Sequence, residues 1–199
     1  MGAIGPGQSL ACWTEPAWRR YCDDRRPIVL KPNLVKAAPP PITTPVALVA
    51  ALVDYLQQAR PGAKIVVAEG CGAKDYDTDH CFAALGYARM AMERGVELVD
   101  LNQAPLTRLS RPQYGRWPEM HLPSLLLDAF LISVPVLKAH TLAKVTLTMK
   151  NMMGAAPPAR YQQGGTGKKP PFTRVFRRRW RTLTAIAAPT SPCLTPLLA

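Results

Sequence analysis

Short apolar runs alternate with stretches of helical period between residue 26 and about residue 143. The runs are too short for helices and are bounded by Gly, Pro or Asn, as is typical of strands. The strand-like runs are 27–33, 64–70, 96–102 and 129–138. The stretches 42–63 and 77–95 have apolar residues three and four positions apart, which predicts two amphipathic helical segments.

Turn and capping residues mark where the helical segments begin and end. Thr43 or Thr44 can cap the first helix, and Pro45 suits its first position. In the second segment, Gly86 predicts an interruption or bend and Gly95 predicts a stop. The two helical segments therefore have predictable limits.

Strands that alternate with helices predict an α/β fold class, with a largely parallel sheet and flanking helices in a Rossmann-like three-layer arrangement. We expect the sheet to be incomplete at the C-terminus. The Pro- and Arg-rich segment 103–127 is expected to be an excursion that packs over the sheet. Three parts are predicted: a poorly defined N-terminal extension over 1–25, the α/β domain over 26–165 and a basic, Pro-rich tail over 166–199.

Polar residues at the carboxyl ends of the predicted strands are candidate site residues, because the ligand crevice of such a sheet lies there. They are Lys31, Asn33, Glu69, Asp100, Asn102, Lys138 and His140. Lysine and asparagine offer charge and hydrogen bonds to a carboxylate or phosphate, and an imidazole can act as a general acid or base. The helix start at Thr43 and Thr44 adds backbone N–H groups that favour an anion. The alternative is that each residue is an ordinary solvated strand end or turn.

The five cysteines, Cys12, Cys22, Cys71, Cys81 and Cys193, contain no CxxC pair and are too scattered for a zinc or iron–sulfur site. We expect free, packed thiols in a reducing cytoplasm, and no metal site. The glycines of "AEGCGAKD" match neither a P-loop nor GxGxxG, so no cofactor is evident. No run of about 18 apolar residues occurs, so no membrane span is predicted.

Six pieces of the chain, "VLKPNLV", "TTPVALVAALVDYL", "VVAEG", "LVDLN", "ISVPVLKAH" and "VTLTMKNMMGAAPPARY", occur in this order. Together they resemble the domain of unknown function 362 family from about residue 26 to residue 165. The resemblance implies an α/β domain found in prokaryotes, sometimes fused to ferredoxin-like iron–sulfur segments, with no settled activity. The polar positions of the pattern fall on Lys31, Asn33, Thr43, Thr44, Glu69, Lys138, His140, Lys150 and Asn151.

We expect this domain to bind or act on a small anionic molecule. Lys31, Lys138 and Lys150 are expected to hold the anion, while Asn33 and Asn151 orient it. His140 or Glu69 would transfer protons. An electron-transfer function with an iron–sulfur partner domain, as in fused relatives, is an alternative that needs CxxCxxC cysteines, which this chain does not have.

The net charge of +12 suggests nucleic acid, but much of it lies in one segment. Residues 166–199 hold seven Lys or Arg and no Asp or Glu, which leaves 18 basic and 13 acidic residues in 1–165. The string "RVFRRRWR" interleaves aromatics with arginines, which suits phosphate contacts and base stacking. A nucleic-acid-binding arm and a natural disordered tail are thus two interpretations of this segment.

We favour a third interpretation, a frameshift near Gly164–Thr166, and do not expect nucleic acid as a partner. With codons chosen freely, a one-base shift can turn this segment into a sequence with acidic residues, a helical period and a strand-like run. The chain would then be a truncated, inactive fragment, because family members continue with more sheet and helix. Sequencing the DNA that encodes Gly164 to Ala199 tests this: no long alternative frame should exist if the tail is natural.

Overall fold

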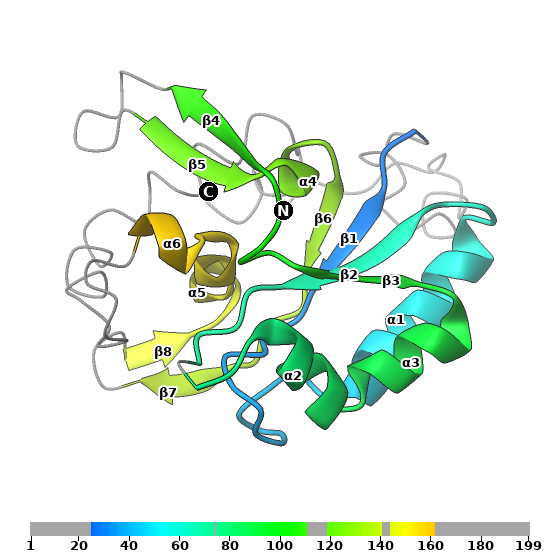
Figure 1. The fold of residues 1–199 in the computed structure, drawn as a ribbon. Coiled ribbons are helices and arrows are strands. Elements are labelled where there is room, and N and C mark those ends of the chain that lie inside the picture. Colours follow the sequence, from blue (N-terminus) through cyan, green and yellow to red (C-terminus); the bar gives the residue numbers. More distant parts are fainter. Residues whose placement is uncertain (1–24, 74, 111–118, 141–143, 162–199) are drawn as a thin grey trace, which may run out of the picture.

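The computed structural model describes residues 25–73, 75–110, 119–140 and 144–161, and the description below applies to these residues. Four parallel strands form one sheet in the order β3-β2-β1-β6 (Figure 1). The strands are β1 (Ile28–Lys31), β2 (Ile65–Glu69), β3 (Glu97–Asp100) and β6 (Phe130–Ser133). The predicted Rossmann-like α/β architecture with a parallel sheet is confirmed.

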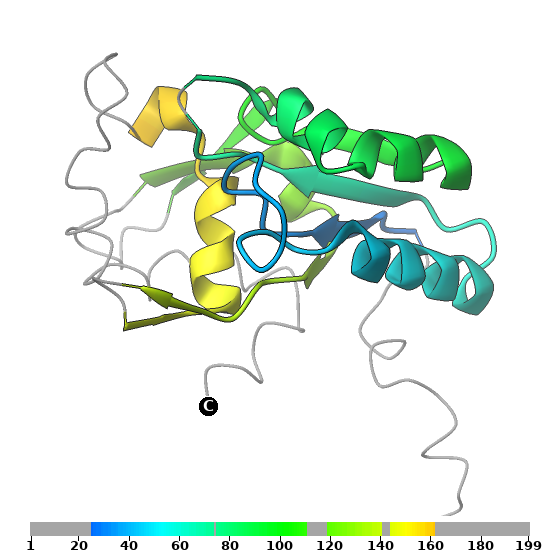
Figure 2. The same ribbon diagram turned by 90° about the horizontal axis from the view of Figure 1, so that it is seen from below.

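Three helices cover one face of the sheet: α1 (Val46–Ala59), α2 (Thr78–Ala84) and α3 (Tyr87–Arg94). Figure 2 shows α1 and α3 side by side over this face. Val49 and Val53 of α1 pack with Tyr87 of α3 and with Ile28 and Leu30 of β1, all fully buried. The alternation of side chains along β1 therefore assigns every second residue to this core.

The other face is covered by the segment between β3 and β6. It contains the antiparallel hairpin β4 (Leu106–Ser110) and β5 (Glu119–Pro123), followed by α4 (Ser124–Leu127). Met120 and Leu122 of β5 pack against Val29 and Val66 of the sheet. The expected excursion over the sheet is thus confirmed, and its regular structure is a hairpin.

The last described elements lie across the carboxyl edge of the sheet. They are β7 (Lys138–His140), β8 (Lys144–Thr146), α5 (Thr148–Asn151), the 3₁₀ helix η3 (Met152–Ala155) and α6 (Pro158–Tyr161). Met152 is buried in the second core, where it joins residues of β5 and the sheet. In the described parts of the chain, no helix combines the length and apolar character needed to cross a membrane.

Helix ends agree with the sequence at the glycines but not at the threonines. Gly86 separates α2 from α3 with a φ of 80°, and Gly95 ends α3 with a φ of 63°. Neither Thr43 nor Thr44 caps α1: its N-cap is Pro45, which has no side-chain capping bond. The hydroxyl of Thr44 instead accepts from the backbone N–H of Asn33 (2.9 Å) and donates to the carbonyl of Val134 (2.7 Å). This threonine therefore joins the loops after β1 and β6.

Candidate functional site

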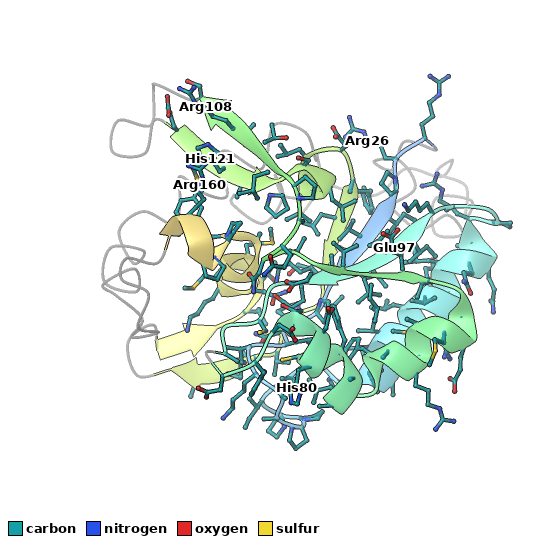
Figure 3. The ribbon with its side chains drawn as sticks, in the orientation of Figure 1. Arg26, His80, Glu97, Arg108, His121 and Arg160 are labelled. Atoms are coloured by element: carbon teal, nitrogen blue, oxygen red, sulfur yellow. The ribbon has the colours of Figure 1, made fainter. Side chains whose placement is uncertain are left out.

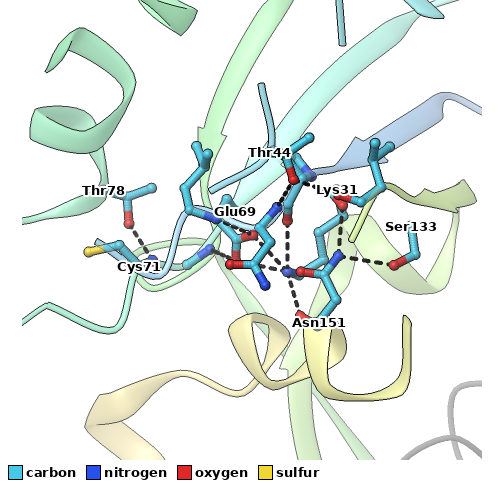
Figure 4. Close-up of polar contacts among 12 residues, drawn as sticks. Lys31, Thr44, Glu69, Cys71, Thr78, Ser133 and Asn151 are labelled. Atoms are coloured by element: carbon cyan, nitrogen blue, oxygen red, sulfur yellow. Dashed lines mark hydrogen bonds and ion pairs between the residues drawn. The ribbon is translucent and has the colours of Figure 1, made fainter. Parts of the chain in front are cut away.

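A buried ion pair lies where β1 and β2 end. The ammonium of Lys31, 0% exposed, donates to both carboxylate oxygens of Glu69, 3% exposed, at 2.8 and 2.9 Å (Figure 4). The two side chains meet because they close neighbouring parallel strands, in which Leu30 lies opposite Val67. Two predicted site residues are thus brought together, and each neutralises the charge of the other.

Asn151, the last residue of α5, also contacts Lys31 of this pair. Its carbonyl accepts from the Lys31 ammonium at 2.7 Å. Its side-chain amide donates to the carbonyl of Lys31 (2.9 Å) and to the hydroxyl of Ser133 (3.0 Å). Because Lys31 and Ser133 are paired residues of β1 and β6, Asn151 bridges the ends of these two strands. The predicted orienting residue therefore holds α5 on the sheet.

Burial controls the protonation chemistry of this cluster. It raises the pKa of Glu69 and lowers that of Lys31, in each case against the opposing effect of their pairing. The Glu69 carboxylate is supported further by the backbone N–H groups of Gly70 (2.9 Å) and Leu34 (3.4 Å). With its donors directed to Glu69 and Asn151, Lys31 would have to give up one of these contacts to bind a ligand directly.

Two glycines that sequence reasoning did not select allow this close packing. A Cβ at Gly154 would overlap Glu69 Oε1 and lie 2.8 Å from Lys31 Nζ. A Cβ at Gly70 would overlap the carbonyl of Gly154 and lie 2.5 Å from Asn102 Oδ1. Neither glycine has a positive φ. Their role is therefore steric, and the only sequence signal is a glycine directly after Glu69 and another within "KNMMG".

Lys138 presents a second positive charge at the same edge. Its half-buried ammonium contacts two uncharged oxygens, the carbonyl of Ile42 at 2.8 Å and Oδ1 of Asn33 at 3.3 Å. Among the residues that the structure describes, no carboxylate lies within ion-pair distance of it. Burial lowers the pKa of Lys138, and the more distant charge of Glu69 opposes this shift. Lys138 and Asn33 are thus brought together as predicted.

The remaining predicted residues are placed less directly. The hydroxyl of buried Thr43 donates to the carbonyl of Ala38 at 2.6 Å, within the loop after β1. Lys150 lies half-buried in α5, next to Asn151 in the chain. The backbone of His140 ends β7, but its side chain lies outside the described part of the structure.

A separate polar network closes the β2–β3 side of the edge. Asp100 accepts from the hydroxyl of Thr78 (2.7 Å) and from the backbone N–H of Asn102 (2.8 Å). The side-chain amide of Asn102 donates to the carbonyl of Cys71 at 3.0 Å. Asp100 and Asn102 therefore hold the loop after β2 against α2, apart from Lys138.

Figure 3 labels the other two histidines, which were not among the predicted site residues. His80 belongs to α2, and its ring contacts that of Tyr76. His121 belongs to β5, where its backbone exchanges hydrogen bonds with the hydroxyl of Tyr161. Their contacts agree with structural or exposed roles.

The strand order places β1 between β2 and β6. From β1 the sheet is extended on one side by β2 and β3, and the chain then returns to add β6 on the other side of β1. This switch point, with a buried ion pair and a second lysine at its carboxyl ends, defines a Rossmann-like α/β domain with a polar edge. A family model described as "Domain of unknown function (DUF362)" matches residues 28–191. The chain belongs to this family.

The other comparisons add no relative: the searches of curated proteins and of solved structures gave no match. The family match extends past residue 165 into the basic segment. Residues 162–199 lie outside the described residues, as do residues 1–24. The frameshift, the disordered tail and the nucleic-acid arm therefore stay predictions.

Proposed function

We propose that the chain binds a small anionic molecule at the carboxyl edge of its sheet, beside the switch point between β1 and β6. The charge of Lys138, which no carboxylate among the described residues balances, supports this most directly. Its ammonium contacts Ile42 and Asn33 through uncharged oxygens, whereas the charge of Lys31 is balanced by Glu69. A partly desolvated cation gains most from a ligand that brings the opposite charge.

The neighbouring residues have complementary roles in this proposal. Asn33 orients the anion beside Lys138, and Lys150 adds positive charge from α5. Lys31, Glu69 and Asn151 hold β1, β2 and α5 in place behind the site. Where the ligand reacts, His140, two positions after Lys138 in β7, is the first candidate for a general acid or base, and Glu69 is the second candidate for a proton transfer.

Replacing Lys138 with methionine should weaken anion binding about 10- to 100-fold, which corresponds to the loss of a charge-assisted hydrogen bond. The probes are sulfate, inorganic phosphate and malonate, measured on the full chain by calorimetry and by the shift of the melting temperature. The matched control is K64M, because Lys64 is an exposed lysine at the amino-terminal side of β2. Equal losses in K138M and K64M would reject the site.

Sulfate binding should also weaken as the pH rises toward 10.5, the ordinary lysine value. Burial lowers the pKa of Lys138, so the ammonium loses its proton at a lower pH than an exposed lysine does. Sulfate keeps its charge throughout this range, so the change reports the protein. Titrations at several pH values should show the loss in the wild type and in K64M, and a clearly smaller change with pH in K138M.

A further inference from the structure

Cys71 and Cys81 are buried in the same core, between the sheet and the helices that cover it. Cys71 is 3% exposed and Cys81 is 0% exposed, and both are free thiols. The expectation of packed thiols is confirmed for these two cysteines. Neither cysteine takes part in the proposed anion site.

Local geometry brings the two cysteines together. The backbone N–H of Cys71 donates to the hydroxyl of Thr78 at 3.1 Å, and Thr78 is the first residue of α2. Cys81 follows Thr78 by three positions, so both share one face of the helix. Cys71 therefore lies beside the face of α2 that carries Cys81. Figure 4 shows Cys71 next to Thr78 on this side of the edge.

The Cys71 thiol also affects the titration of Cys81. Burial, and after it the charge and hydrogen bond of the Cys71 thiol, raise the pKa of Cys81 to about 12. At neutral pH Cys81 is therefore held as a thiol, a poor first nucleophile. A thiol in this state is suited to the second, resolving step of a two-step oxidation of the pair.

We propose that Cys71 and Cys81 are a redox modification site, at which hydrogen peroxide converts the two thiols into one intramolecular disulfide. The Cys71 thiolate attacks a peroxide oxygen, the O–O bond breaks, and hydroxide takes up the proton of Cys71 and leaves as water. The resulting sulfenic acid is attacked by the sulfur of Cys81, the S–O bond breaks, and a second water leaves with the proton of Cys81. The two thiols lose two electrons, and the peroxide gains them.

Burial selects the oxidant and the product. A small, uncharged molecule such as peroxide enters a packed core through local opening more readily than a large disulfide does. The neighbouring thiol then competes with further oxidation of the sulfenic acid. The disulfide would link the loop after β2 to α2. Because Cys71 directly follows Glu69 and Gly70, the bond would form next to the polar residues of the carboxyl edge.

The test uses the full chain with Cys12, Cys22 and Cys193 replaced by serine, which keeps Cys71 and Cys81 intact. The protein is treated with hydrogen peroxide, blocked with an alkylating agent in denaturant, and digested with trypsin without reduction. Trypsin cuts after Lys64, Lys74 and Arg89, so the two cysteines fall into the separate peptides 65–74 and 75–89. The expected product is these two peptides joined, at a mass two hydrogen atoms below their sum, and separated by reductant.

The same digest of a sample oxidised after unfolding measures how much the native structure favours the bond. We expect a several-fold faster formation of the joined peptide in the native state than in denaturant at equal peroxide. Sulfinic or sulfonic acid at Cys71 without the joined peptide, or equal rates in both states, would overturn the proposal. Far-UV circular dichroism of the triple serine variant before oxidation shows whether it is folded, so that equal rates in the two states cannot come from an unfolded variant.

Discussion

Replacing Lys31 with methionine is expected to lower the free energy of unfolding by about 3–5 kcal/mol. The change removes the ammonium that satisfies Glu69 and leaves that carboxylate buried without its partner. It also removes the donor to the carbonyl of Asn151, so α5 loses a contact with the sheet. Urea unfolding of the full chain, followed by far-UV circular dichroism, measures the loss.

The double variant K31M/E69Q tests whether the loss in K31M comes from the unpaired carboxylate of Glu69. A neutral glutamine needs no ammonium and can still accept from the N–H of Gly70 or Leu34. We expect it to recover more than half of the loss caused by K31M. The matched control is K64M in the exposed Lys64–Glu97 pair, with side chains 65% and 52% exposed, which should cost about 1 kcal/mol or less. Equal costs for K31M and K64M would show that the buried pair is not a stabilising unit.

The main sheet could be predicted because its strands are short apolar runs with helical segments between them. In β1 and β2 all residues are buried, which produces a continuous apolar run. The β4–β5 hairpin could not be predicted in the same way. Its β4 strand, "LTRLS", is half-buried or exposed throughout, so burial gives it only a weak alternating pattern. The buried Met120 and Leu122 of β5 show most clearly which side packs on the sheet, and Leu109 of β4 packs against the same core.

The sequence predicted that Lys31, Asn33, Glu69 and Lys138 lie at the carboxyl edge, but not which of them bond to one another. Lys31 and Glu69 are 38 positions apart in the chain, and their pairing depends on the order and register of β1 and β2. The sequence does contain a signal for this pair, because Lys31 ends one predicted strand and Glu69, with the opposite charge, ends the next. The bridge from Asn151 to Ser133 depends on how α5 crosses the edge, for which the chain carries no local pattern.

The different burial and partners of Lys31 and Lys138 have a physical reason. Lys31 belongs to β1 in the middle of the sheet, where burial is complete and a carboxylate is needed beside it. Lys138 lies in β7, after β6, which is the outermost strand of the described sheet. Its ammonium stays half-buried, so it does not need a carboxylate beside it, and the neutral oxygens of Asn33 and Ile42 are its partners. This difference in burial is why the proposed anion site is placed at Lys138 and not at Lys31.

Replacing Gly154 with alanine should also lower the free energy of unfolding by about 3–5 kcal/mol, because it adds overpacking to loss of the buried pair. The new methyl group would overlap Glu69 Oε1 and lie 2.8 Å from Lys31 Nζ and 3.1 Å from the carbonyl of Gly70. The two closest of these atoms are the ends of the Glu69 and Lys31 side chains, which can move aside only by giving up the buried ion pair and their bonds to Gly70 and Asn151. Urea unfolding measures the loss.

Two further variants identify the cause. In an E69A background the added methyl group no longer meets a carboxylate, so G154A should cost much less there than in the wild type, and the cycle gives the coupling energy directly. The control G62A tests a glycine with a φ of 81° and no atom within 4 Å of the added Cβ. It should cost about 1–2 kcal/mol through the left-handed backbone alone. A G154A loss that equals that of G62A, or that is unchanged by E69A, would mean that α5 and η3 can move away from the sheet, and that the contact with Glu69 does not fix their position.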